Sequence, residues 1–367
     1  MEYCKKCILP NTKPGVYLDD AGLCNACRNV NVKKSINWKK RFEQLKKIVK
    51  KIKKNNTANN YDCIVPISSG GKDSWYQAYV MSKVLKCKVL CVNLVAHIPT
   101  TEGINNLNKM ILDLNVDILK ITLKPSVHSY LRKKAFVELG EPNWAEHCMV
   151  FAGVFNAAKI YNIPLIIWGE DISFEFGGLS KKQTSDASNL LYNNDLIKDK
   201  RVEDLSDETV SKRDLLFYEF PTKNEILKSN IQSLYLGYFV NWDGAKNYKF
   251  VKRRGFKAEK KIRNGHFVNY DNIDEKLCEI NGWMKYLKMG FWYPTDELCY
   301  EIYNKRLTRE KAQKIVKKLT GQFPSYLNDF LRFHNISESE FYDVANKFVN
   351  KKIFKKKGNW WELKKYP

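Results

Sequence analysis

The stretch Ser69-Gly70-Gly71-Lys72-Asp73-Ser74 comes directly after the apolar run 63–67 and directly before a segment of helical character. Two glycines let the backbone come close to a ligand, and successive amides before a helix N-terminus form a cradle for an anion. Neither the Walker-type ending Gly-Lys-Ser/Thr nor the dinucleotide pattern GxGxxG is present. The carboxylate of Asp73 would repel a bare phosphate, so we expect a divalent cation between them. The stretch therefore predicts a phosphate site, the alternative being a tight turn with a serine helix cap.

On both sides of this loop, short β-branched runs alternate with helical segments. The strand-like runs are 63–67, 88–92, 117–121 and 164–168, and the helix-like stretches lie near 74–85, 103–114, 125–139 and 147–161. This alternation predicts an α/β fold, a parallel sheet with helices on both faces. Ligands of such sheets bind at the carboxyl ends of the strands, which is where the glycine loop lies.

Four cysteines stand near the start of the chain, as Cys4-x-x-Cys7 and Cys24-x-x-Cys27 with 16 residues between the pairs. Two such pairs can complete a closed tetrahedral Zn²⁺ site, which has no open coordination position. We therefore expect a structural metal that holds a segment too small to have its own core. The alternative is four unrelated free thiols.

The chain has 367 residues, enough for two or three folding units. The expected units are a zinc-ribbon module (1–32), a basic amphipathic helix and linker (33–60), the domain that carries the loop (61–295) and a C-terminal helical region (296–367). The apolar face of the amphipathic helix is expected to pack on a neighbouring domain, and an anionic membrane surface is the alternative. That face consists of Trp38, Phe42, Leu45, Val49 and Ile52.

The net charge of +23 comes from 63 Lys and Arg residues against 40 Asp and Glu residues. Nucleic acid, an anionic membrane or an anionic small molecule would each suit such a charge, so it identifies no partner. No apolar stretch of about 18 residues is present, and the start lacks the apolar core of a signal peptide. We expect a cytoplasmic protein with no membrane insertion.

The pattern Ser-Gly-Gly-x-Asp-Ser after a first strand resembles the pyrophosphate loop (PP-loop) of the N-type ATP pyrophosphatases, which have the adenine nucleotide alpha hydrolase-like fold. The resemblance implies that ATP is cleaved between its α and β phosphates. It implies that Lys72 neutralises pyrophosphate, that Asp73 holds Mg²⁺, and that Ser69, Gly70, Gly71 and Ser74 contact the phosphates. It further places adenosine against Val92 and Asn93. It also places metal- or substrate-directed carboxylates at Gly169-Glu170-Asp171, for which a helix-capping turn is the alternative.

The order of the cysteine pairs and the loop narrows the resemblance to the bacterial N-acetyl-sugar amidotransferases. The segments that carry it are 3–12, 22–28, 61–74, 165–170, 236–243 and 269–272, so it extends over nearly the whole chain. One departure is Ser68, where a small or apolar residue is expected. The resemblance implies adenylylation of an acetamido oxygen of an N-acetylated sugar, nucleotide-linked or nonulosonic, followed by displacement with ammonia to form an acetamidino group, in the synthesis of lipopolysaccharide or related glycans.

No glutaminase motif is apparent, so the resemblance implies that ammonia comes from a separate glutaminase with a barrel-type companion. The main alternative is a tRNA-modifying PP-loop enzyme of the thiolase or lysidine-synthetase type, but no CxxC pair beyond the four N-terminal cysteines supports it and no nucleic acid is expected. A zinc-ribbon binder of nucleic acid would leave Asp73 in the loop unexplained. Two features stay undecided between a ligand site and ordinary packing, His147 and the pair Trp242-Asp243.

Overall fold

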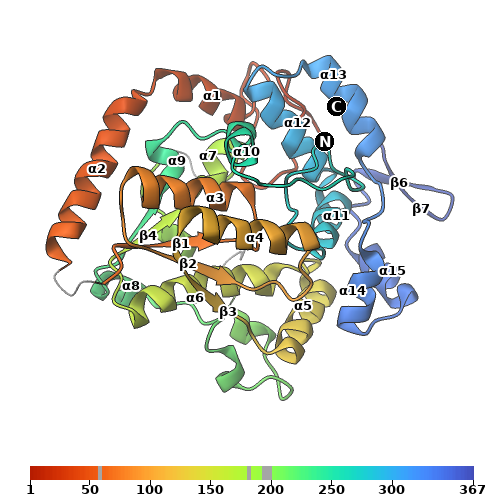
Figure 1. The fold of residues 1–367 in the computed structure, drawn as a ribbon. Helices are drawn as coiled ribbons and strands as arrows, with labels where there is room; N and C mark the ends of the chain where they lie inside the picture. The colour runs from red at the N-terminus through yellow and green to blue at the C-terminus, as the bar shows by residue number, and fades with distance from the viewer. Residues whose placement is uncertain (57–59, 180–182, 192–200) are drawn as a thin grey trace.

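The computed structural model describes residues 1–56, 60–179, 183–191 and 201–367, and residues 57–59 of the predicted linker lie outside this part. A five-stranded sheet lies at its centre, with the order β3-β2-β1-β4-β5 and with every neighbouring pair parallel. Helices lie above and below it, as Figure 1 shows. The strands are β1 (Cys63–Ile67), β2 (Val89–Leu94), β3 (Asp117–Ile121), β4 (Leu165–Trp168) and β5 (Gln232–Tyr235). The predicted α/β fold is confirmed.

Alternate residues of the inner strands enter two separate apolar clusters, one on each face of the sheet. Ile64, Val92 and Ile166 pack with helices α5 and α6, whereas Val65 and Ile167 pack with α2, α3 and α4. Because both faces are covered, the strands are apolar runs without polar alternation. The helices are α2 (Trp38–Asn55), α3 (Lys72–Tyr79, continued by a π-helical turn Val80–Val84), α4 (Thr101–Leu114), α5 (Pro125–Leu139) and α6 (Trp144–Ile160).

The sequence does not predict strand β5, which lies at the edge of the sheet. It has four residues, of which Gln232 is exposed, so it shows no clear apolar pattern. A long connection with several short elements separates it from β4. These elements are α7 (Ile172–Phe176), three 3₁₀ turns (Ser188–Leu191, Val202–Leu205 and Lys212–Leu215) and α8 (Lys223–Lys228), and after β5 come α9 (Leu236–Phe239) and α10 (Gly244–Lys252).

The N-terminal part begins with the cysteine segment and continues into α1 (Asn25–Ser35) and α2. Leu45 and Val49 of α2 are buried, and Phe42, Ile48 and Ile52 pack against the same cluster as α3 and α4. The apolar face of this basic helix therefore packs on the protein, as expected, and most of its lysines are exposed.

The C-terminal part is helical up to residue 347 and then ends in a two-stranded antiparallel hairpin. Thr308 and Ser337 cap two of its helices with their side chains. The hairpin was not expected, because three of the four residues of its first strand are exposed lysines. The elements are α11 (Cys278–Met289), α12 (Tyr293–Tyr303), α13 (Arg309–Leu319), α14 (Leu327–His334), α15 (Glu338–Lys347), β6 (Phe354–Lys357) and β7 (Trp360–Leu363). The division into folding units stays a prediction.

His334, the last residue of α14, is buried where that helix packs against α5. Its Nδ1 lies 3.1 Å from the carbonyl oxygen of Ser129, and its Nε2 has no partner among the described residues. Burial lowers the pKa of His334 to about 3. The unfolded chain binds this proton below about pH 6.5, so stability that is present above that pH is lost as the pH falls toward 3.

We expect this histidine to cost the fold about 2 kcal/mol between pH 7 and pH 5. His334→Gln should remove that part of the acid sensitivity, because glutamine does not titrate. Urea unfolding of both chains at pH 5 and pH 7 measures the difference. The same loss of stability in both chains would show that His334 does not carry it.

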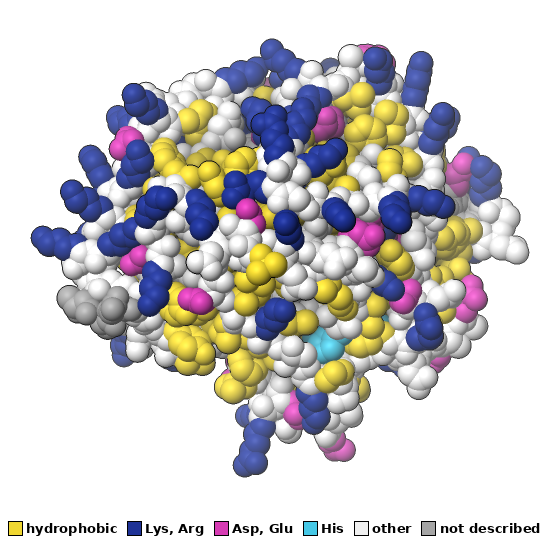
Figure 2. Space-filling view, viewed as in Figure 1, with side chains coloured by type: hydrophobic (Ala, Val, Ile, Leu, Met, Phe, Trp, Pro, Cys, Tyr) yellow, Lys and Arg dark blue, Asp and Glu magenta, His cyan; other side chains and the backbone are white. Residues whose placement is uncertain are grey.

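The surface is rich in basic side chains. Figure 2 shows Lys and Arg distributed over the viewed face among apolar and uncharged atoms. Within the ranges that the structure describes, no helix has both the length and the apolar composition needed to span a membrane.

Candidate active site

The glycine loop joins the carboxyl end of β1 to the start of α3. Gly70 has a φ of +110°, and a side chain there would clash with the carbonyl group of Gly103, so only glycine fits. Gly71 is the N-cap of α3 and has no side-chain cap, which leaves the first amides of the helix available to a ligand. Ser68 Oγ accepts a hydrogen bond from the amide of Gly71 at 3.1 Å. The unexpected serine thus shapes the loop from within.

The serine side chains of the loop form hydrogen bonds within the protein. Ser74 Oγ accepts a hydrogen bond from the Ser68 amide at 3.0 Å and lies 3.3 Å from the Ser68 hydroxyl. Ser69 Oγ accepts one from Asn93 Nδ2 at 3.3 Å, and the same Nδ2 donates to the carbonyl oxygen of Ile67 at 3.0 Å. Asn93, fully buried on β2, therefore holds the end of β1 and the start of the loop together.

Lys72 lies between two carboxylates. Its ammonium group pairs with Asp73 at 2.6 Å and with Asp271. Burial alone would lower the pKa of Lys72, but the charges of Asp271 and Asp73 outweigh burial and raise it. Asp73 also accepts a hydrogen bond from Asn247 Nδ2 at 2.7 Å. The lysine is thus a fixed cation at the mouth of the loop.

A cavity of about 490 Å³ opens beside this loop. Its size suits a small-molecule ligand. The loop lines part of it, and residues between 268 and 301 line much of the rest. Eight carboxylates and three lysines line it, so the cavity is acidic although the chain as a whole is strongly basic.

The predicted site residues fall into two groups. The cavity is lined by Gly71, Lys72, Asp73, Ser74 and Glu170. Those not among its lining residues are Ser69, Gly70, Val92, Asn93, Gly169 and Asp171. Of the second group, Val92 is fully buried in the core against α6, so its side chain is not available to a ligand.

The carboxylates after β4 have different surroundings. Burial, and then the nearby charge of Asp73, raises the pKa of Glu170 to about 7. Asp171 instead caps α7, and its Oδ1 accepts a hydrogen bond from the Phe174 amide at 3.2 Å. Asp171 thus makes the helix-capping contact that the sequence analysis gives as the alternative. Glu170 stays a candidate catalytic or ligand-binding residue.

Several cavity residues have no assigned role in the sequence analysis. Asp271 belongs to a segment quoted only for its resemblance, and nothing in the sequence links it to Lys72. Two undecided residues, His147 and Trp242, also line the cavity. Burial, and then the charge of Lys285, lowers the pKa of His147 to about 4, so its imidazole is neutral near pH 7.

The four N-terminal cysteines meet in one buried cluster. Their Sγ atoms all lie within 4.8 Å of one another. Cys4 and Cys27 are separated by 3.7 Å between sulfurs, and Cys7 and Cys24 by 3.6 Å. Backbone amides point at three of the sulfurs, at 3.3 to 3.4 Å. This set of donors could hold a metal ion.

A family model described as "LPS biosynthesis protein WbpG-like, C-terminal domain" matches residues 264–366. The matched segment is similar to that domain, and it supplies Tyr270, Asp271, Tyr300 and Glu301 to the cavity wall. A search of curated proteins gave no match.

Three solved structures are similar in general fold. An NMN synthetase from Francisella tularensis shares 14% identity over 84% of this chain and 97% of its own, with a TM-score of 0.38. The U34-tRNA thiolase NcsA from Methanococcus maripaludis, solved with its [4Fe-4S] cluster, shares 13% identity over 86% and 89%, with a TM-score of 0.33. An NH3-dependent NAD synthetase from Campylobacter jejuni shares 14% over 62% and 100%, with a TM-score of 0.31.

Proposed function

We propose that the chain is an ATP-dependent amidotransferase that converts the acetamido group of an N-acetylated sugar into an acetamidino group and releases AMP and pyrophosphate. The observation that carries the proposal is the shared cavity. A glycine loop with open helix amides lines part of it, and the segment that matches the WbpG-like domain of lipopolysaccharide biosynthesis lines another part. Such a cavity suits a reaction in which a phosphate donor and a sugar meet.

An acetamido group is a poor electrophile, so its oxygen must first become part of a leaving group. In the proposed reaction that oxygen attacks the α phosphorus of ATP, the bond between the α and β phosphates breaks, and pyrophosphate leaves. Ammonia then adds to the amide carbon, and AMP departs with the original oxygen. Two of the three ammonia hydrogens stay on the new nitrogen of the amidinium product and the third leaves as a proton, which pyrophosphate can take up, so atoms and charges balance.

The residues of the loop suit the phosphates in this scheme. The amides at the start of α3 bind the departing pyrophosphate, and Lys72 gives up its contacts with Asp271 and Asp73 to pair with it. A triphosphate would meet mostly carboxylates in this cavity, so bound Mg²⁺, held by Asp73, would neutralise part of its charge. Glu170, which lines the same cavity, stays a candidate for proton transfer or metal binding.

The cysteine cluster fits a single zinc ion. Zinc bound by four thiolates at about 2.3 Å places neighbouring sulfurs about 3.8 Å apart, close to the 3.6 and 3.7 Å observed. Four ligands leave no open position, so such an ion would be structural. The ammonia would come from a separate glutaminase with a barrel-type companion or from solution.

Incubation with Mg·ATP, ammonium and a panel of N-acetylated sugars tests the proposal. We expect AMP, pyrophosphate and a product about one mass unit lighter, because nitrogen with its hydrogens replaces oxygen, and no AMP when the sugar is omitted or replaced by tRNA. Chromatography of the nucleotides and mass spectrometry of the sugar provide the readout. ADP with phosphate, or AMP that requires tRNA, would contradict the proposed reaction.

A further inference from the structure

We propose that the cysteine cluster positions the wall of the cavity at Trp242 through Lys33 and Tyr300, so that metal binding at the cysteines sets how tightly the cavity holds its ligand. Lys33 and the carboxylate it binds, Glu175, do not line the cavity. They are therefore positioning residues, and the cysteine segment has a role beyond holding itself together. The statement about ligand affinity rests on the proposed function, whereas the contacts described next do not.

The first connection runs along α1. This helix begins inside the second cysteine pair, with Cys27 in its first turn. Near its other end, Lys33 Nζ donates hydrogen bonds to both carboxylate oxygens of Glu175 and to the carbonyl oxygen of Trp242, each at 2.7 Å. A displacement of α1 would therefore move Lys33, which is the shared hydrogen-bond partner of the buried Glu175 carboxylate and of the Trp242 backbone.

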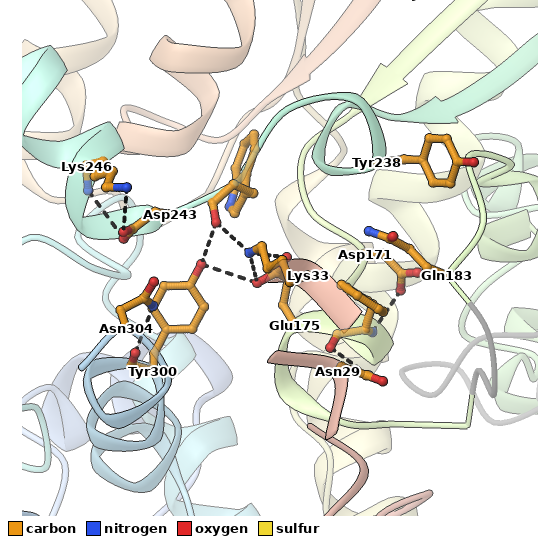
Figure 3. A network of polar contacts seen from close by, with 12 residues as sticks. Asn29, Lys33, Asp171, Glu175, Gln183, Tyr238, Asp243, Lys246, Tyr300 and Asn304 are labelled. Atoms are coloured by element: carbon orange, nitrogen blue, oxygen red, sulfur yellow. Dashed lines mark hydrogen bonds and ion pairs between the residues drawn. The ribbon is translucent and has the colours of Figure 1, made fainter. Parts of the chain in front are cut away.

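Two asparagines of α1 strengthen this connection. Asn29 Nδ2 donates to the carbonyl oxygen of Phe174 at 3.0 Å, and Asn25 Nδ2 lies 3.4 Å from the carbonyl oxygen of Gly178. Both acceptors belong to the short segment around α7, which directly follows Glu170. Figure 3 shows Asn29 and Lys33 directed at this segment. The helix that starts at the cysteines thus holds α7 at several points.

The second connection runs along α12. The hydroxyl oxygen of Tyr303 lies 3.6 Å from Cys7 Sγ. One turn earlier on the same helix, the Tyr300 hydroxyl lies within hydrogen-bond distance of both Glu175 Oε2 (3.4 Å) and the Trp242 carbonyl oxygen (3.2 Å). Tyr300 and Tyr303 face the same side of α12 because they are three residues apart. A second helix therefore links the cysteines to the same two acceptors.

Glu175 is the point where the two connections meet, as Figure 3 shows. Its side chain is 5% exposed, and burial raises the pKa of its carboxyl group, which the charge of Lys33 opposes. A buried carboxylate that loses its cation must bind a proton or move toward water. The ion pair between Lys33 and Glu175 therefore favours one position of the Glu175 side chain, and it forms only while α1 stays in place.

Trp242 transmits this arrangement to the phosphate loop. Trp242 is among the residues that line the cavity, and its ring packs edge-on against Tyr76 of α3, with 5.9 Å between ring centroids. The helix α3 begins at the glycine loop. A shift of the Trp242 backbone would thus change the cavity wall and one side of the helix that binds phosphate.

The variant Lys33→Met tests the proposal, with Lys34→Met as a matched control because Lys34 is its exposed neighbour on α1. We expect Lys33→Met to keep its metal content, to speed hydrogen exchange in segments 172–178 and 240–246, and to weaken binding of an ATP analogue with a methylene bridge between the α and β phosphates, with Mg²⁺, by about tenfold. The control should match the unchanged chain in all three.

Removal of the metal gives the decisive comparison. We expect chelation to weaken analogue binding in the unchanged chain and to have little further effect in Lys33→Met, because both changes break the same connection. The proposal would be overturned if chelation weakened analogue binding equally in both chains. It would also be overturned if Lys33→Met left hydrogen exchange in segments 172–178 and 240–246 unaltered.

Two further variants separate the loss of the Lys33 contacts from a general loss of stability. Lys33→Met with Glu175→Met removes the unpaired charge, so we expect normal stability but a loosened 240–246 segment, and unaltered exchange there would count against the proposal. Lys33→Arg should restore much of the binding because it keeps the cation. If the unchanged chain binds no nucleotide, the proposed function fails, while the exchange measurements still decide whether Lys33 positions the wall.

Discussion

Asp73→Asn is expected to lower turnover about 100- to 1000-fold while the chain keeps its fold. The substitution removes the negative charge that would hold Mg²⁺ against the phosphates, and it keeps the size of the side chain. Lys72 retains its pairing with Asp271, so the loop has a reason to keep its shape. Turnover measured as AMP release, together with the thermal unfolding midpoint, gives both readouts.

Asp113→Asn is a matched control for this experiment. Asp113 is also a partly buried aspartate with a basic partner, Arg254 at 2.7 Å, but it lies on α4 and does not line the cavity. Asparagine keeps an oxygen that can accept the hydrogen bond that Trp75 Nε1 donates to Asp113 at 3.0 Å, so we expect turnover within a few-fold of the wild-type chain. Residual activity of Asp73→Asn within tenfold of the unchanged chain would remove Asp73 from the proposed metal role.

The parts of the site that the sequence predicts well are those whose residues are neighbours along the chain. The loop from Ser69 to Ser74 can be recognised from the sequence alone, because the glycines, the helix start and the preceding apolar strand are contiguous. The cysteine pairs are equally local, and the structure brings all four sulfurs together. Strands β1 to β4 follow from apolar runs that only a sheet covered on both faces would bury.

The parts that the sequence does not reveal depend on pairings between distant residues. Asn247 and Asp73 are 174 residues apart, and Tyr300 and Glu175 are 125 apart, yet each pair shares a hydrogen bond. Their residue types are ordinary for surface positions, so no pattern marks them. Asp171 shows the reverse case, because an acidic residue after a strand suits both a ligand site and a helix cap, and only the structure shows the cap.

The second large effect is expected at Arg132, which is fully buried on α5. Its guanidinium pairs with Glu275 at 2.7 Å and with Glu146 at 3.1 Å, and it donates to Asn143 Oδ1 at 2.6 Å. Arg132→Met leaves the buried Glu275 without its cation, so we expect the free energy of unfolding to fall by about 3 to 5 kcal/mol. Urea unfolding near neutral pH measures the loss.

The pH dependence separates this electrostatic loss from a simple packing defect. Burial, and then the charge of Glu275, already raises the pKa of Glu146 to about 8, and removal of Arg132 should raise it further. A carboxyl whose pKa is raised by folding gives up stability as the pH rises through that value, so the deficit of Arg132→Met should be larger at pH 8 than at pH 5. Arg254→Met, in which the single carboxylate of Asp113 loses a partly exposed arginine, should cost less than Arg132→Met, and about equally at both values. A deficit for Arg132→Met that stays constant between pH 5 and pH 8 would mean that lost packing, and not the unpaired carboxylates, accounts for it.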